Sequence, residues 1–202
     1  MPGLVNPGTT SERVFDALKR EIISGERAPG TKLEPAALAE QLNSSATPVR
    51  DALHRLAGAH LVELRASEGF YLPFVTEPGL HDLYAWNAEL VRLLARSWTS
   101  HRPPRKADEL PADIGRATAA FFDLFVDPSH NREHADQMDF ANDRLAAPRA
   151  AERHVFEDLE AELRALAVAF DNAPVRELVK LVAAYHRRRL QATATIVRAL
   201  YR

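Results

Sequence analysis

The stretch SSATPVRDALHRLAG, residues 44–58, predicts a turn followed by a short amphipathic helix. Its apolar positions recur at helical spacing and form one stripe that we expect to be buried: Val49, Leu53 and Leu56. The other faces carry only two permanent cations, Arg50 and Arg55. A helix of this size fits a DNA groove, so the flanking sequence decides between a DNA-reading helix and an ordinary solvated one.

The start of this helix has two candidate caps. Ser45 can accept a hydrogen bond from the first turn. Alternatively Thr47 is the cap and Pro48 takes the first helical position, where its missing N–H costs nothing. Either cap places hydroxyl groups beside the partial positive charge of a helix N-terminus.

Two further helices are predicted before it. Residues 11–26 form the first, with Ser11 as its cap and Gly25 as its stop. A Pro-Gly turn in residues 27–33 follows. Residues 35–42 predict a second, short helix that has a proline in its first turn.

After this helix the apolar period changes to alternation. LVELRASEGFYLPFV, residues 61–75, predicts two strands joined by a turn at residues 67–69. Helix, helix, turn, helix and hairpin within about 65 residues is the order of a winged helix-turn-helix, whose third helix enters the major groove. In that fold the hairpin contacts the DNA backbone.

The remainder of the chain predicts helices and no strand. The helical runs are residues 79–98, 112–126, 134–147, 149–170 and 174–202. A polar, proline-rich break separates the first two, and five or six helices with short connections fit a bundle. Aromatic residues at helical spacing predict a core or a dimer interface: Trp86, Trp98, Phe121, Phe122, Phe125 and Phe140.

The expected fold class is therefore mainly α, with three parts. Residues 1–10 are a flexible N-terminus, residues 11–75 a winged helix-turn-helix domain, and residues 76–202 an all-helical domain. No repeat of fixed period occurs.

Composition narrows the function classes. The net charge is −2, and residues 11–75 carry slightly more acidic than basic side chains, so bulk charge does not predict nucleic-acid binding. The chain has no cysteine, which excludes disulfides, thiolate metal sites and a cysteine nucleophile. No apolar run approaches the roughly 20 residues of a membrane span, and the N-terminus lacks an export signal, so we expect a cytoplasmic protein.

Residues 11–75 resemble the GntR family of bacterial transcription regulators. The matching motifs are IISGERAPGTKL, then LAE, then TPVRDAL. The most specific matching residues are Gly25, Pro29, Gly30, Leu38, Ala39, Glu40 and the run from Thr47 to Leu53. The helical remainder resembles the FCD or FadR-type ligand-sensing domain of one large branch of that family, by architecture and length.

This resemblance implies a homodimer that binds a palindromic operator, by family default as a repressor. A small metabolite in the helical domain would change the placement of the two reading heads. By the family pattern, Thr47 and Arg50 face the bases, Ser45 meets phosphate and Gly69 lies at the wing tip. The predicted DNA-binding set is Ser44, Ser45, Thr47, Arg50, Arg55 and Gly69.

The sequence departs from the family pattern at two basic positions. Ala46 stands where relatives have arginine, and Glu68 where the wing has a basic residue before its glycine. Each lost cation removes one released counterion and so lowers DNA affinity. The cations that can substitute are Arg55, Arg65 and Lys32. The alternative is a protein-interaction module that has kept the winged-helix fold with weakened DNA binding.

The metal site of FCD domains is degraded in this sequence. Family members bind the metal through an aspartate and a histidine one helical turn apart, and here Met138 and Asn142 occupy those positions. His186 matches a third ligand, and a fourth would lie beyond the last residue. We therefore expect no metal cofactor; a slipped register that uses Asp139, His134 and His186 stays open.

Candidate effector residues carry positive charge or hydrogen-bonding groups, which suits an acidic metabolite. They are Arg92, Arg96, Asn142, His186 and Arg189. The arginines could equally be solvated helix faces. An enzyme is not expected, because the sequence has no glycine-rich phosphate loop, no nucleophile elbow and no His-Glu-x-x-His motif.

Overall fold

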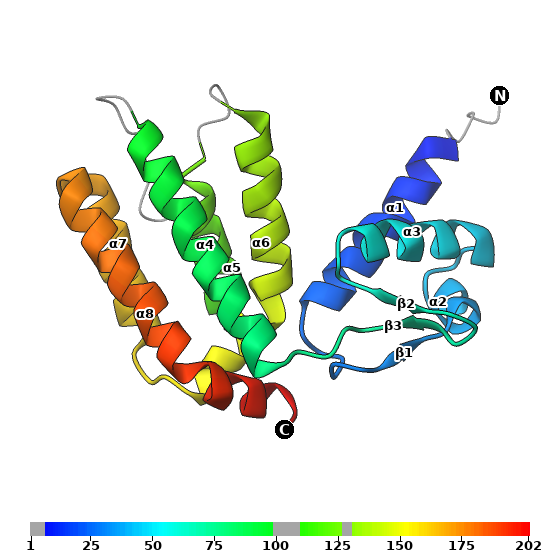
Figure 1. Cartoon of the computed structure of the whole chain (residues 1–202). Helices are drawn as coiled ribbons and strands as arrows, with labels where there is room; N and C mark the ends of the chain where they lie inside the picture. Colours follow the sequence, from blue (N-terminus) through cyan, green and yellow to red (C-terminus); the bar gives the residue numbers. More distant parts are fainter. Residues whose placement is uncertain (1–6, 99–109, 127–130) are drawn as a thin grey trace. The chain divides into compact units, whose positions relative to one another are not determined.

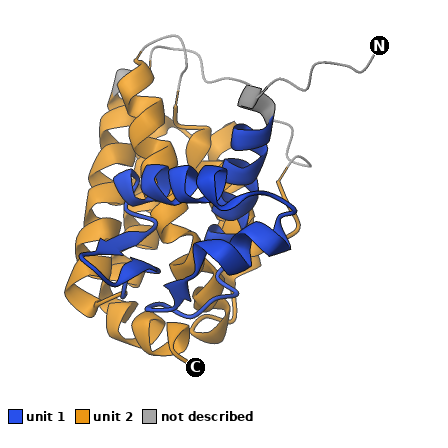
Figure 2. Ribbon diagram, turned by 90° about the vertical axis from the view of Figure 1, so that its right-hand side faces the viewer, with its two compact units in different colours: residues 1–74 blue, residues 75–202 orange. Residues whose placement is uncertain are grey.

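A computed structural model of the chain describes residues 7–98, 110–126 and 131–202. The chain forms two compact units, which are coloured separately in Figure 2: Met1–Phe74 and Val75–Arg202. Each unit contains its own apolar core. The mainly α fold class is confirmed, with a small antiparallel sheet in the first unit.

The N-terminal unit is a winged helix-turn-helix (Figure 1). Its helices are α1 (Pro7–Ile23), α2 (Pro35–Gln41) and α3 (Ala46–Gly58). Its strands are β1 (Lys32–Leu33), β2 (Glu63–Arg65) and β3 (Gly69–Tyr71), in the order β1-β3-β2. The stripe predicted for α3 is buried, because Val49, Leu53 and Leu56 pack into the core that the three helices and the sheet share.

The structure differs from the expectation at two points in this unit and decides between the two candidate caps of α3. Helix α1 begins at Pro7 and not at Ser11, so residues 7–10 of the expected flexible terminus are helical, while residues 1–6 lie outside the described part. Strand β1 was not predicted, because a strand of two residues has no period of its own and forms by pairing Leu33 with Phe70 of β3. Ser45, not Thr47, is the N-cap residue of α3, and its side chain makes no cap hydrogen bond.

The C-terminal unit is a bundle of long helices (Figure 1). These are α4 (Glu77–Ser97), α5 (Ile114–Asp123), α6 (Arg132–Ala151), α7 (Leu159–Asn172) and α8 (Val175–Leu200). A short 3-10 turn, η2 (Glu152–His154), follows α6. Helix α4 packs against both α8 and α6, so side chains from these three helices meet in the interior.

The helix expected over residues 149–170 does not exist as one piece. Residues 149–151 complete α6, which passes through Pro148, and α7 begins only at Leu159. The turn between them buries the side chain of Glu152. Apolar spacing could not reveal this break, because the turn is stabilised by the buried contacts of that carboxylate. Most of the proline-rich break at residues 102–111 lies outside the described part.

Aromatic side chains fill much of the second core. Phe121 and Phe122 of α5 are fully buried, and so is Phe125, which lies just after the helix. Trp98 packs on Phe125, and its indole N–H donates to the Phe125 carbonyl at 3.2 Å. Trp86 was expected in the core or in an interface and is 45% exposed here.

The two ends of the helical unit meet at one side chain. The Tyr201 hydroxyl accepts from the Val75 N–H at 3.0 Å and donates to the Val75 carbonyl at 3.1 Å. The first residue of this unit is thus tied to the end of α8. Within the described residues, no helix has the length and apolar character needed to cross a membrane.

Candidate nucleic-acid interface and ligand site

The start of α3 presents a small polar surface. Ser45, Thr47 and Arg50 are exposed there. The Arg50 side chain forms no hydrogen bond or ion pair with any other part of the chain that the structure describes. Its guanidinium group is therefore available to a partner, while Val49 on the opposite face anchors the helix in the core.

The other predicted DNA-contact side chains on and before α3 are buried or paired within the unit. Ser44 lies in the turn before α3, where its N–H donates to the Ala39 carbonyl at 2.9 Å and its hydroxyl is buried without a hydrogen-bond partner among the described residues. Arg55 donates to Glu12 of α1 at 3.1 Å, and its guanidinium lies 3.8 Å from the centre of the Phe15 ring. The structure therefore groups Ser45, Thr47 and Arg50 and directs Arg55 toward α1.

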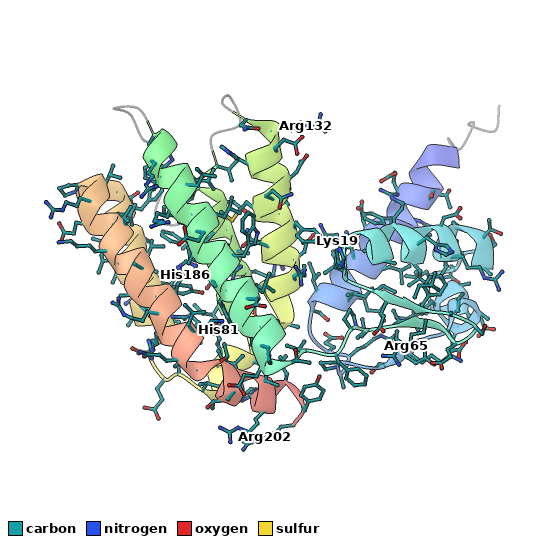
Figure 3. All side chains as sticks on the ribbon, in the orientation of Figure 1. Lys19, Arg65, His81, Arg132, His186 and Arg202 are labelled. Carbon is teal, nitrogen blue, oxygen red and sulfur yellow. The ribbon has the colours of Figure 1, made fainter. Side chains whose placement is uncertain are left out.

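The two remaining substitute cations are also paired with carboxylates. Lys32 lies 2.7 Å from Glu34. Arg65, labelled in Figure 3, lies 3.0 Å from Glu63 and 4.1 Å from the centre of the Tyr71 ring. A phosphate group has to compete with these acids, which reduces the electrostatic contribution that each cation can make to DNA binding.

The wing turn requires unusual backbone angles. Ser67 has φ 62° and Gly69 has φ 101°, a region in which glycine is favoured. Gly69 begins β3, and the next residue, Phe70, packs edge-on against His54 of α3 with ring centroids 5.0 Å apart. His54 therefore joins the helix to the wing. His60 has φ 56° just after the helix, where its N–H donates to the Ala57 carbonyl.

The predicted effector residues separate into exposed and buried groups. Arg92 and Arg96 are exposed on α4, and Arg92 pairs with Glu89 of its own helix. Arg92 and His186 both line a groove of about 240 Å³ formed by side chains of α4 and α8. The arginines of α4 thus lie at the surface, whereas Asn142, His186 and Arg189 are buried.

His186 is held as a neutral side chain inside the bundle (Figure 3). Its Nδ1 lies 2.8 Å from the Val182 carbonyl and its Nε2 3.0 Å from Asn87 Oδ1. Burial, together with the positive charges of Arg149 and Arg189, lowers the pKa of His186 to about 3. A neutral imidazole has one N–H, so one ring nitrogen donates a hydrogen bond and the other only lies beside the second polar group.

Arg189 is fully paired. Its Nη2 lies 2.8 Å from Glu152, and its Nη1 lies 2.6 Å from Glu162. Glu152 also accepts from the Tyr84 hydroxyl at 2.5 Å. Because carboxylates already satisfy this guanidinium, it has little to offer a ligand, contrary to its expected role as an effector residue.

A second buried arginine was missed at the sequence level. Arg149 of α6 is 1% exposed and donates from Nη1 to Asn142 Oδ1 at 2.8 Å. The Asn142 amide in turn donates to Asp123 at 2.6 Å. Partial burial, and then the neighbouring Asp139 carboxylate, raises the pKa of Asp123 to about 6. The only unusual neighbour of Arg149 in the sequence is Pro148, and a proline does not predict that the next charged side chain is buried.

The residues at the family's metal position do not fit a metal ion. The Asn142 amide is already engaged on both sides, and one of its partners is the Arg149 guanidinium, which would repel a cation. In the slipped register, Asp139 is exposed and His134 lies in the first turn of α6. The described ranges contain no group of three or more histidine, aspartate or glutamate side chains arranged to hold a metal.

Comparison with known proteins agrees with this geometry. Residues 10–72 match the family described as bacterial regulatory proteins, gntR family. The HTH-type transcriptional regulator McbR of Escherichia coli K12 is 31% identical over 98 residues, which are 48% of this chain and 44% of McbR. YdhC of Bacillus subtilis 168, an uncharacterized HTH-type transcriptional regulator, is 23% identical over 147 residues, 65% of this chain and 66% of YdhC. The aligned regions thus span about half to two thirds of these relatives.

Solved structures extend the similarity to both units. A GntR-type regulator from Rhodococcus sp. RHA1 superimposes with a TM-score of 0.74 at 17% identity, covering 93% of this chain and 97% of that one. E. coli McbR/YncC gives a TM-score of 0.70 at 18% identity, covering 92% of this chain and 97% of that one. These similarities establish the fold.

The fold and the exposed start of α3 define a winged helix-turn-helix protein with an all-helical second unit. Residues 10–72, which make up most of the N-terminal unit, match the gntR family of bacterial regulatory proteins.

Proposed function

We propose that the protein is a cytoplasmic transcriptional regulator that binds a palindromic operator as a homodimer and acts as a repressor. A small acidic metabolite in the helical unit modulates its DNA binding, as in the FCD branch of the family. The observation that supports this best is the free guanidinium of Arg50 beside Thr47 and Ser45 at the exposed start of α3.

The chemistry of these three side chains suits double-stranded DNA. Arginine can donate two hydrogen bonds to guanine O6 and N7 in the major groove. Serine and threonine hydroxyls at a helix N-terminus add short donors beside its partial positive charge, which favours phosphate. In this arrangement Arg50 reads bases, Thr47 lies next to it, and Ser45 positions the helix on the backbone.

The test is a binding titration with DNA from the protein's own upstream region at several salt concentrations. We expect a specific complex that contains two chains per operator and weakens as salt rises. Arg50→Ala should abolish specific binding while leaving the circular dichroism spectrum unchanged. Arg20→Ala, at an exposed position of α1, is the matched control and should bind as the wild type does.

The second candidate is a protein-interaction module with weakened DNA binding. It is favoured by Ala46 and Glu68 and by the pairing of Lys32, Arg55 and Arg65 with carboxylates. Absence of any DNA complex at low salt would reject the regulator in favour of this module. Undiminished specific binding by Arg50→Ala would refute the role of that arginine.

A further inference from the structure

The interior of the helical unit holds a cation whose hydrogen bonds are incomplete. Arg149 is 1% exposed, and only its Nη1 has a partner, Asn142. Its Nε and Nη2 are buried and make no hydrogen bond to any described residue. Burying a guanidinium without compensating partners is costly, so the free Nε and Nη2 donors favour the binding of an acceptor.

No carboxylate of the described residues forms an ion pair with Arg149, unlike Arg189. The acid linked to it, Asp123, is reached only through the Asn142 amide. The protein therefore positions the Nη1 side of Arg149 with a neutral group. The opposite edge, which bears Nε and Nη2, keeps its donors for another acceptor.

A second orphan donor lies nearby on α8. The Tyr185 hydroxyl is buried and has no hydrogen-bond partner among the described residues. The Phe122 ring connects the two groups, since the Arg149 guanidinium lies 5.3 Å and the Tyr185 ring 5.2 Å from its centre. Burial raises the pKa of Tyr185 to about 12, so its hydroxyl keeps its proton and acts as a donor at neutral pH.

These donors match a planar oxyanion. The Nε and Nη2 hydrogens of a guanidinium point in parallel and bind both oxygens of a carboxylate at once. The Tyr185 hydroxyl can supply a third hydrogen bond, and Phe122 supplies an apolar surface that excludes water. Fixed donors in a water-poor interior make each such contact stronger than it is in water.

We infer that the helical unit binds a small oxyanion, a carboxylate above all, on the Nε/Nη2 edge of Arg149, with the Tyr185 hydroxyl as an auxiliary donor and without a metal ion. The assignment of this oxyanion to the effector rests on the proposed function. The binding itself requires no DNA. The source of the oxyanion is either a carboxylate metabolite or a phosphate group.

The experiment uses the full chain without DNA, in a buffer that contains EDTA. Acetate, benzoate and inorganic phosphate are titrated separately against chloride at equal ionic strength. The readouts are the thermal midpoint Tm and the NMR resonance of the Arg149 Nε–H. We expect at least one of these anions to raise Tm and to shift that resonance with saturation, and the preferred anion identifies the source.

Variants localise the binding. Arg149→Met should weaken it at least about tenfold and Tyr185→Phe by about threefold to tenfold, because each removes donors from the oxyanion. Arg149→Lys keeps the charge, lacks the two parallel donors, and should also bind more weakly. Arg176→Met, at an exposed position of α8, removes the same charge and should retain wild-type binding.

Two results would overturn the inference. One is the absence of saturable binding by all three anions to the wild type, which needs no variant and so does not depend on variant folding. The other is equal binding by folded Arg149→Met. If the wild type does not bind an operator, only the proposed function is contradicted, because the anion titration contains no DNA.

Discussion

Three cations on the surface of the N-terminal unit, Lys32, Arg55 and Arg65, are paired with carboxylates, whereas the buried Arg149 of the helical unit is not. Arg55 and Arg65 reach Glu12 and Glu63 although both arginines are partly in water. Arg149 is buried and reaches only an amide oxygen. Surface pairs contribute about 0–1 kcal/mol, so their acids chiefly reduce the charge that DNA meets. An unpaired buried cation is costly, which marks it as a candidate for function.

The two buried arginines provide the sharpest contrast and the largest expected effect. Arg189→Met leaves Glu152 buried without its cation and should lower the free energy of unfolding by about 3–5 kcal/mol. Arg149→Met leaves no carboxylate bare and should leave the free energy unchanged or raise it by about 1 kcal/mol. Urea denaturation in chloride buffer measures both. Equal losses in the two variants would show that Arg149 is paired after all.

The buried His186 gives an intermediate effect that depends on pH. Its pKa falls from 6.5 to about 3 on folding, so the unfolded chain binds the proton more readily between these values. Stability should therefore decrease as pH falls below 6.5, by up to about 1.4 kcal/mol per unit from this group. His186→Gln should flatten that slope in urea denaturation at several pH values.

Asp123 changes the pH dependence of stability in the opposite direction, so its contribution has to be eliminated by substitution. Its pKa is raised on folding from 3.8 to about 6, so its contribution to stability increases as pH falls from about 6 toward 3.8. The comparison of His186→Gln with its parent is therefore made in an Asp123→Asn background. A slope that His186→Gln leaves unchanged would mean that the histidine is not held neutral.

The smallest effect concerns the surface pairs. Glu12→Gln frees Arg55 and should strengthen operator binding by a factor of about two to five, with a steeper dependence on salt. Asp82→Asn, an equal charge change on the helical unit, is the control. If Glu12→Gln and the control bind equally, Arg55 makes no contribution to the interface.

Much of the N-terminal fold was accessible from the sequence. The stripe of α3, the wing turn and the helix over residues 35–42 follow from local spacing and turn residues, and the structure places all three close to their predicted bounds. The DNA-reading role of Arg50 stays a prediction from the family pattern. Exposure supports it, because a free guanidinium is what that role requires.

Side-chain partners were not accessible in the same way. Nothing in the sequence indicated that Arg55 turns toward Glu12, that Arg189 meets two carboxylates, or that Arg149 is buried. Such pairs join residues that are far apart in the chain, and the helical pattern is the same whether an arginine faces solvent or the interior. The expected helix over residues 149–170 was wrong for a similar reason, since the break buries Glu152 against distant groups.

The sequence by itself determined the order of the helices and the wing hairpin, the fold class and the resemblance of the N-terminal unit to one family, because apolar period, prolines and glycines act over a few residues. Only the tertiary structure decided which charges are satisfied, because that depends on how long helices pack against one another. Two results of that packing bear most directly on function. The Arg50 side chain has no partner at the surface, and the Nε and Nη2 of Arg149 have none in the interior, among the described residues.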